Sequence, residues 1–201
     1  MRLFPLFCLL LLLGMTAAAT LHAAPQMRPY TGIGLLLLSE SAAGGDDVPL
    51  YGHPGLDRTG SLKPGGLPSY GRMLAPGTGE TVLIVTGRKG DWYRVEYDDA
   101  GREAWLNPGR SGAFRPWDDF LRGRVCAPLP GTARKYARLS PSPGAPPLDP
   151  GAVVAFAKIL RVEQDWAMVL SDRNMLGWMR WRDEDGRLLT AVIDSPREMQ
   201  P

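Results

Sequence analysis

Short apolar runs separated by glycine and aspartate dominate the middle of the chain. Residues 82–85 are continuously apolar. In residues 92–97 the side chains Trp92, Arg94 and Glu96 alternate with Tyr93, Val95 and Tyr97, a period of two. A period of two sends alternate side chains to opposite faces of a strand, so both runs predict β-strands. Residues 98–101 predict a turn that contains glycine, and residues 101–106 predict a third strand after it.

A weaker copy of this pattern follows later in the chain. It consists of three runs, at residues 152–160, 165–171 and 176–181. Trp105 lies 13 positions after Trp92, and Trp178 lies 12 positions after Trp166. Trp92 and Trp166 each follow an aspartate and open a strand-like run. Similarity of this kind within one chain predicts an internal repeat.

The remaining segments predict more short strands joined by turns, at residues 30–38, 48–51 and 188–193. A connection without predicted structure runs from about residue 55 to residue 80. Residues 116–121 predict one helical turn, in which Trp117 and Phe120 pack three positions apart. The chain holds 24 glycines and 19 prolines among its 201 residues, which favours many short strands. The sequence therefore predicts an all-β protein.

The N-terminus has the order of a secretory signal peptide. Arg2 precedes an apolar run that ends in five leucines, and small residues follow it. Cleavage is expected after Ala19, Ala23 or Ala24, with the last two favoured. The alternative is an uncleaved membrane anchor, because residues 3–21 carry no charge and are about long enough to span a bilayer. We expect a signal peptide over residues 1–24, export to the periplasm or the medium, and no membrane insertion after cleavage.

Charge and reactive residues exclude several classes of function. The net charge of +2, with basic residues scattered singly among acids, argues against nucleic-acid binding. After residue 24 one histidine, His53, and one cysteine, Cys126, remain, and a zinc site requires three or four protein ligands. Cys126 precedes a proline-rich stretch without the helix start that activates a catalytic thiol. Paired acids are interpreted as turn residues. We expect no enzyme activity, no cofactor and no metal.

Cys126 has two interpretations. A single cysteine cannot form an internal disulfide, so it is either a buried small apolar residue or an unpaired thiol open to pairing between chains. The buried interpretation is favoured, because free cysteines are among the most buried residues.

The order of strands and aromatic residues resembles the bacterial SH3-like domains. The segments that carry the resemblance are residues 50–54, 82–85, 91–97 and 101–105 in the first unit, and residues 139–141, 153–156, 165–169 and 177–178 in the second. In the first unit Ala104-Trp105 replaces the expected Gly-Trp, and the loop before Val82 is unusually long. The resemblance implies two tandem small β-barrels, the second divergent, with five strands or so in each.

The resemblance sets the expected domain organisation. The expected parts are a first SH3-like domain at residues 30–115 with an inserted loop at about 55–80, a linker at 116–135, a second SH3-like domain at 136–194, and a polar tail at 195–201.

The resemblance also implies a non-catalytic module of exported proteins that binds cell-wall peptide, peptidoglycan or another envelope protein. Two alternatives are a structural accessory subunit of an envelope complex and a cryptic cell-wall hydrolase. Trp92 and Trp105 are expected to be buried for structural reasons, and an aromatic-lined groove is the competing interpretation. The candidate ligand-binding residues are Tyr51, Tyr93, Tyr97 and Trp105.

Overall fold

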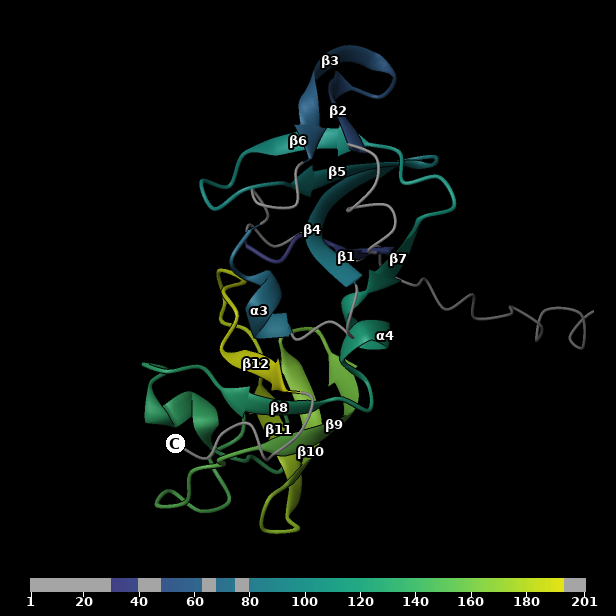
Figure 1. Ribbon diagram of the computed structural model, residues 1–201. Coiled ribbons are helices and arrows are strands. Elements are labelled where there is room, and N and C mark those ends of the chain that lie inside the picture. Colours follow the sequence, from purple (N-terminus) through teal and green to yellow (C-terminus); the bar gives the residue numbers. More distant parts are fainter. Residues whose placement is uncertain (1–29, 40–47, 63–67, 75–79, 194–201) are drawn as a thin grey trace, which may run out of the picture.

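The protein is built from two antiparallel β-sheets that follow each other along the chain (Figure 1). The structure, a computed structural model, describes residues 30–39, 48–62, 68–74 and 80–193. The all-β prediction is confirmed. The expected signal peptide and the tail at residues 195–201 lie outside the described residues.

The first sheet has the strand order β3-β2-β6-β5-β4-β1-β7. Its strands are β1 (Gly34–Ser39), β2 (Val48–His53), β3 (Leu56–Leu62), β4 (Glu80–Lys89), β5 (Trp92–Glu96), β6 (Glu103–Leu106) and β7 (Gly112–Pro116). The short helix α3 (Gly71–Leu74) precedes β4, and α4 (Trp117–Leu121) follows β7.

The second sheet has the order β11-β10-β9-β8-β12. Its strands are β8 (Val125–Pro128), β9 (Ala157–Glu163), β10 (Trp166–Ser171), β11 (Leu176–Arg180) and β12 (Thr190–Ile193). A 3₁₀ turn, η2 (Arg134–Ala137), lies between β8 and β9 in the chain.

The leucine run of β1 is buried on both of its faces. Leu36 and Leu38 belong to a core lined by the first sheet alone, together with Leu62 of β3 and Phe114 of β7. Strands β3 and β7 are the two edges of the sheet, so the sheet must curve for both to reach one core. Within the described residues no strand pairing closes this curve into a ring.

A second core joins the two sheets. Leu35 and Leu37, on the other face of β1, pack in one cluster with Trp117 and Phe120 of α4 and with Cys126 of β8. The cluster continues through the inner face of the second sheet: Ala157, Ile159, Ala167, Val169, Met179, Trp181 and Val192. The predicted helical turn at residues 116–121 is confirmed, and it lies at this junction (Figure 1).

A buried polar network also spans the junction. Nε of Arg182 donates to Asp165 at 2.8 Å, and a terminal nitrogen of Arg182 donates to Thr31 Oγ1 at 2.8 Å. The indole of Trp117 donates to the Thr31 carbonyl at 2.7 Å, and its ring lies 5.0 Å from that of Trp181. Residues before β1, in α4 and after β11 are thereby held together.

The two sheets contain matching three-strand meanders, β4–β5–β6 and β9–β10–β11. Trp92 opens β5 opposite the last residue of β4, and Trp166 opens β10 opposite the last residue of β9. In each meander the third residue of the second strand then faces the third residue of the third strand. Arg94 faces Trp105 in the first meander, and Met168 faces Trp178 in the second. The connecting turns each begin with a residue in the left-handed region, Gly90 and Gln164.

Three expectations from the sequence need correction. Residues 55–80 are not one unstructured connection, because β3 and α3 form within them; β3 pairs with β2 through the turn at Gly55. The expected linker at residues 116–135 contains α4 and β8, which supply side chains to the shared core.

The first strand of the second meander also begins later than expected. Residues 152–156 carry no strand; Asp149 accepts hydrogen bonds from the amides of Gly151 and Ala152, and Val154 bonds to Ala137. These contacts turn the segment across the end of the sheet, and β9 starts at Ala157.

Candidate binding site

An open hollow lies on the outer face of the second sheet beside Trp166. One part has a volume of about 250 Å³ and an adjoining part about 530 Å³; Trp166 and Gly144 line both. The lining residues of the first part are Lys135, Tyr136, Arg138, Ser140, Gly144, Ala145, Pro147, Trp166 and Arg180. Pro143, Glu163 and Gln164 complete the second part. Sites for small ligands in proteins have volumes of this order.

Strand register places three side chains next to one another on the floor of the hollow. Trp166 pairs with Glu163 on β9 and with Arg180 on β11. Residues directly opposite each other in antiparallel strands project to the same face, so these three side chains form one row. The Arg180 guanidinium lies 4.9 Å from the centre of the Trp166 ring, a cation–π contact. The row presents an aromatic surface with a cation at one end and a carboxylate at the other.

The proline-rich segment forms the wall. Ser140 exchanges two backbone hydrogen bonds with Trp178 on β11, of 2.9 and 2.8 Å. The amide of Leu148 bonds to the carbonyl of Leu139 at 2.8 Å and returns the chain to the sheet. Prolines have fixed φ angles, so this anchored loop has little freedom to collapse into the hollow.

Basic side chains outnumber acidic ones around the hollow. Lys135, Arg138 and Arg180 line its first part, where Lys135 also lies 4.6 Å from the Tyr136 ring centre. Arg180 forms an ion pair with the exposed Glu184 at 3.0 Å. The Nε atom of Arg138 is buried and has no hydrogen-bond partner. Nη1 of Arg180 is likewise buried without a hydrogen bond. These two donors are the most unusual feature of the site, because buried polar groups are nearly always paired.

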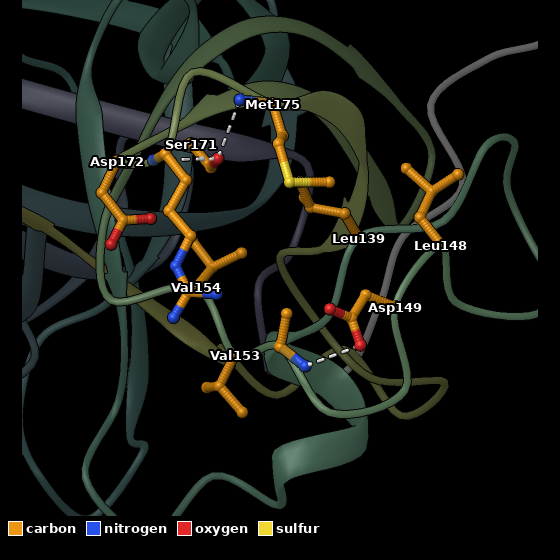
Figure 2. A pocket seen from close by; sticks show the side chains of 10 residues that line it. Leu139, Leu148, Asp149, Val153, Val154, Ser171, Asp172 and Met175 are labelled. Atoms are coloured by element: carbon orange, nitrogen blue, oxygen red, sulfur yellow. Dashed lines mark hydrogen bonds between the residues drawn. The ribbon is translucent and has the colours of Figure 1, made fainter.

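A smaller hollow occurs next to the sheet, between residues 148–154 and the turn at residues 171–175 (Figure 2). Its volume of about 20 Å³ holds little more than one water molecule. Ser171 Oγ accepts hydrogen bonds from the amides of Arg173 and Met175, so it is occupied in shaping the turn (Figure 2). Leu139 and Val154 line the interior as buried apolar residues. A hollow of this size has no room for a ligand larger than a water molecule, so it is not a candidate site.

The structure divides the four sequence-predicted binding residues between two faces of the first sheet. Tyr51 and Trp105 pair across β2 and β6 on the outer face. Trp92 joins them there, with its ring edge-on to Tyr51 at 5.2 Å, and Arg94 lies 6.0 Å from the centre of the Trp105 ring. All four side chains are half-buried, and they form an aromatic strip on the outer face.

Tyr93 and Tyr97 point to the opposite face, into the core of the first sheet. Tyr93 is only 9% exposed and stacks on Phe114, with ring centres 5.6 Å apart. Tyr97 packs against the same core and is covered by Arg102, whose guanidinium is 5.4 Å from the ring centre. Strand alternation separates these tyrosines from Tyr51 and Trp105.

Sequence reasoning missed the residues around Trp166. The repeat marked Trp166 as the counterpart of Trp92, which was the one available signal. Nothing local in the sequence connected Lys135 or Arg138 with Arg180, about 40 positions later. The bridge between Ser140 and Trp178 brings these segments side by side.

Cys126 and His53 lie on different sheets. Cys126 is buried in β8, and burial raises the pKa of its thiol to about 12. His53 ends β2 at the surface, with its Nδ1 3.4 Å from a carboxylate oxygen of Asp57. The described residues contain no group of three or more histidine, cysteine or acidic side chains arranged to hold a metal ion.

Comparison with known proteins adds no family to this description: no protein-family model matches the chain, and no curated protein gives a significant match. Among the described residues, no helix is long and apolar enough to cross a membrane.

Proposed function

We propose that the protein is an exported, non-catalytic binding module for cell-wall peptide or glycan, and that it binds through the Trp166 hollow. The observation that carries the proposal is the half-buried Trp166 ring on the floor of an open hollow, with a fixed proline-rich wall beside it. Aromatic-lined grooves with rigid walls are suited to bind extended peptide or glycan chains without catalysing a reaction of the bound chain. The N-terminal sequence pattern supports export.

We further propose that the two meanders are diverged copies of one SH3-like unit. Support comes from the matching register at the first tryptophan of each unit and from the left-handed residues Gly90 and Gln164 in equivalent turns. In the first copy this register places Trp92 beside Tyr51, and in the second it places Trp166 beside the hollow. The binding surface of the second copy is therefore the better formed one.

A pull-down on purified cell-wall sacculi tests the binding function. Trp166→Ala should abolish retention, because it removes the aromatic floor of the hollow. Trp105→Ala is the matched control, since Trp105 is also half-buried on an outer sheet face with an arginine over its ring. Trp105→Ala should leave retention unchanged. Loss of retention in the Trp105 variant alone would move the site to the first sheet and refute the proposal.

A second candidate function, contact with another envelope protein, is favoured by one observation. Leu170 of β10 and Leu176 of β11 face each other on the outer side of the second sheet and are 37% and 56% exposed. An apolar pair in this position is suited to a protein interface. If wild-type protein is not retained on sacculi, this accessory role becomes the better proposal.

A further inference from the structure

The two arginines at the hollow are placed side by side by the strand register. Ser140 lies opposite Trp178 in an antiparallel bridge, so Arg138, two residues before Ser140, comes alongside Arg180, two residues after Trp178. The backbone of Arg138 is extended, with φ −116° and ψ 150°, which continues the strand geometry. Both side chains line the first part of the hollow. Like charges opposite each other on neighbouring strands destabilise a sheet.

The hydrogen-bonding state of the pair favours an anion as the ligand. Nη1 of Arg180 lies 3.0 Å from a carboxylate oxygen of the exposed Glu184, but this buried nitrogen makes no hydrogen bond, so the contact is an ion pair without hydrogen-bond geometry. The Nε of Arg138 is buried and makes no hydrogen bond. A buried donor without a partner destabilises the fold, and it does so more strongly when the group is charged. A bound anion would satisfy this donor and offset the repulsion between the two cations.

On the basis of the binding function proposed above, we infer that the hollow recognises a carboxylate of its ligand, held between Arg138 and Arg180 beside the Trp166 ring. A guanidinium presents two parallel N–H groups that match the two oxygens of a carboxylate. Glu163 in the adjoining part of the hollow is paired with Arg161 and adds little charge to the site. Glu184 already offsets the charge of Arg180, so a single negative charge fits the two arginines better than a doubly charged phosphate. The Trp166 ring supports the chain that carries the carboxylate.

Titration with matched small ligands tests this inference. The probes are N-acetyl-alanyl-alanine with a free carboxylate, its C-terminal amide, glucuronic acid as a sugar carboxylate, and inorganic phosphate. Binding is followed by NMR of the Trp166 indole and the arginine Nε–H signals in the full chain. The acid should shift both signals and bind about tenfold or more tightly than the amide, because the amide cannot form the charge-assisted pair. The response to glucuronic acid then shows whether peptide or sugar is the preferred source of the carboxylate.

Variants of the two arginines complete the test. Arg138→Gln and Arg180→Gln should each lower the affinity for the acid about tenfold and leave that for the amide unchanged, because each removes one charged donor. Arg122→Gln, at an exposed position on α4, is the control and should bind like the wild type. A thermal melt checks the folding of each variant. If Arg138→Gln does not fold, Arg180→Gln and the acid–amide pair on the wild type decide the question.

Several outcomes would overturn the inference: equal affinity for acid and amide, tighter binding of phosphate than of either carboxylate, or no binding of any carboxylate at millimolar concentration. Each of these can occur while Trp166→Ala still abolishes retention on sacculi. In that case the proposed binding function survives and the carboxylate subsite does not.

Discussion

At the scale of single residues, the Tyr70 side chain bridges a gap in the backbone hydrogen bonding between β4 and β5. β4 pairs with β5 only from Val85 onward, so the backbone groups of Ile84 and Glu96 do not bond to each other. The Tyr70 hydroxyl accepts from the Ile84 amide at 2.8 Å and donates to the Glu96 carbonyl at 3.1 Å. Burial raises the pKa of Tyr70, so its hydroxyl keeps the proton that it donates.

Cys126 gives a prediction at the same scale. Burial raises the pKa of its thiol from 9.0 to about 12, so the native thiol stays protonated where an unfolded one ionises. The native protein should therefore not react with a thiol reagent such as Ellman's reagent at pH 8, and should react fully in guanidinium chloride. Reaction of the native protein at the rate of a free cysteine would contradict the buried position.

The pH dependence of stability follows from the same pKa. Below pH 9 the thiol is protonated in both states, so its contribution to the free energy of unfolding is fully present. Above pH 9 the unfolded chain loses the proton and the native chain does not, so stability falls as the pH rises toward 12. Urea titrations at pH 8 and pH 10 should show this loss in the wild type, and a smaller loss in Cys126→Ala.

At the scale of elements, the contact between β11 and the Leu139–Ser140 segment positions the wall of the hollow. Gly177, on the inner face of β11, has no side chain, and a Cβ there would lie 2.9 Å from Leu139 Cβ and 3.2 Å from the Ser140 carbonyl oxygen. This close approach allows the two backbone bonds between Ser140 and Trp178. The wall and both arginines depend on it.

Gly177→Ala should therefore weaken both stability and binding. The added methyl group must push Leu139 and Ser140 away from β11, at a cost of about 1–3 kcal/mol typical of overpacking. Chemical denaturation measures this cost, and the sacculus pull-down measures the effect on the hollow. Gly60→Ala is the control in β3, since a Cβ there meets nothing within 4 Å. Equal stability of the two variants would contradict the role assigned to Gly177.

At the scale of the whole molecule, the two sheets share one core and one buried polar network. The shared core extends from Leu35 of β1 through Trp117 to Val192 of β12. Arg182 and Asp165 belong to the second sheet region, and Thr31, which bonds to Arg182, precedes the first sheet. Loss of either sheet would expose apolar surface of the other. We expect the two sheets to unfold together in a single transition.

Asp165→Ala tests this coupling. It leaves the Arg182 guanidinium buried without its carboxylate, and removal of one partner of a buried pair costs about 3–5 kcal/mol. Tryptophan fluorescence and far-UV circular dichroism should report the same lowered midpoint in urea. Asp118→Ala, at an exposed ion pair with Arg122, should change stability by less than about 1 kcal/mol. Two separated transitions would show that the sheets are independent folding units.

Much of the strand pattern was predictable because it depends on local side-chain alternation. The runs at residues 82–85 and 92–97 and the hairpin of β10 and β11 formed where alternation and turn residues placed them. β3 was missed because the segment Leu56–Leu62 is mostly exposed and polar, and its pairing with β2 forms it. β8 was missed because it has only four residues and ends in a proline, which is too short for an alternation of apolar and polar side chains to be recognised. Its pairing with β9 and β12 forms the strand.

The all-β class and the repeated Asp-Trp strand could be read from the amino-acid pattern alone, because both depend on composition or on neighbouring residues. The pattern favoured a buried Cys126 but left the alternative open, and the fold settles it by placing Cys126 in β8 inside the shared core. Only the tertiary structure decided that both sheets share a core and that Arg138 lies beside Arg180 next to Trp166. These relations join residues far apart in the chain through strand pairing and apolar contact. The physical reason is that pairing between distant segments is selected by the burial and hydrogen bonding of the whole fold, which no local pattern contains.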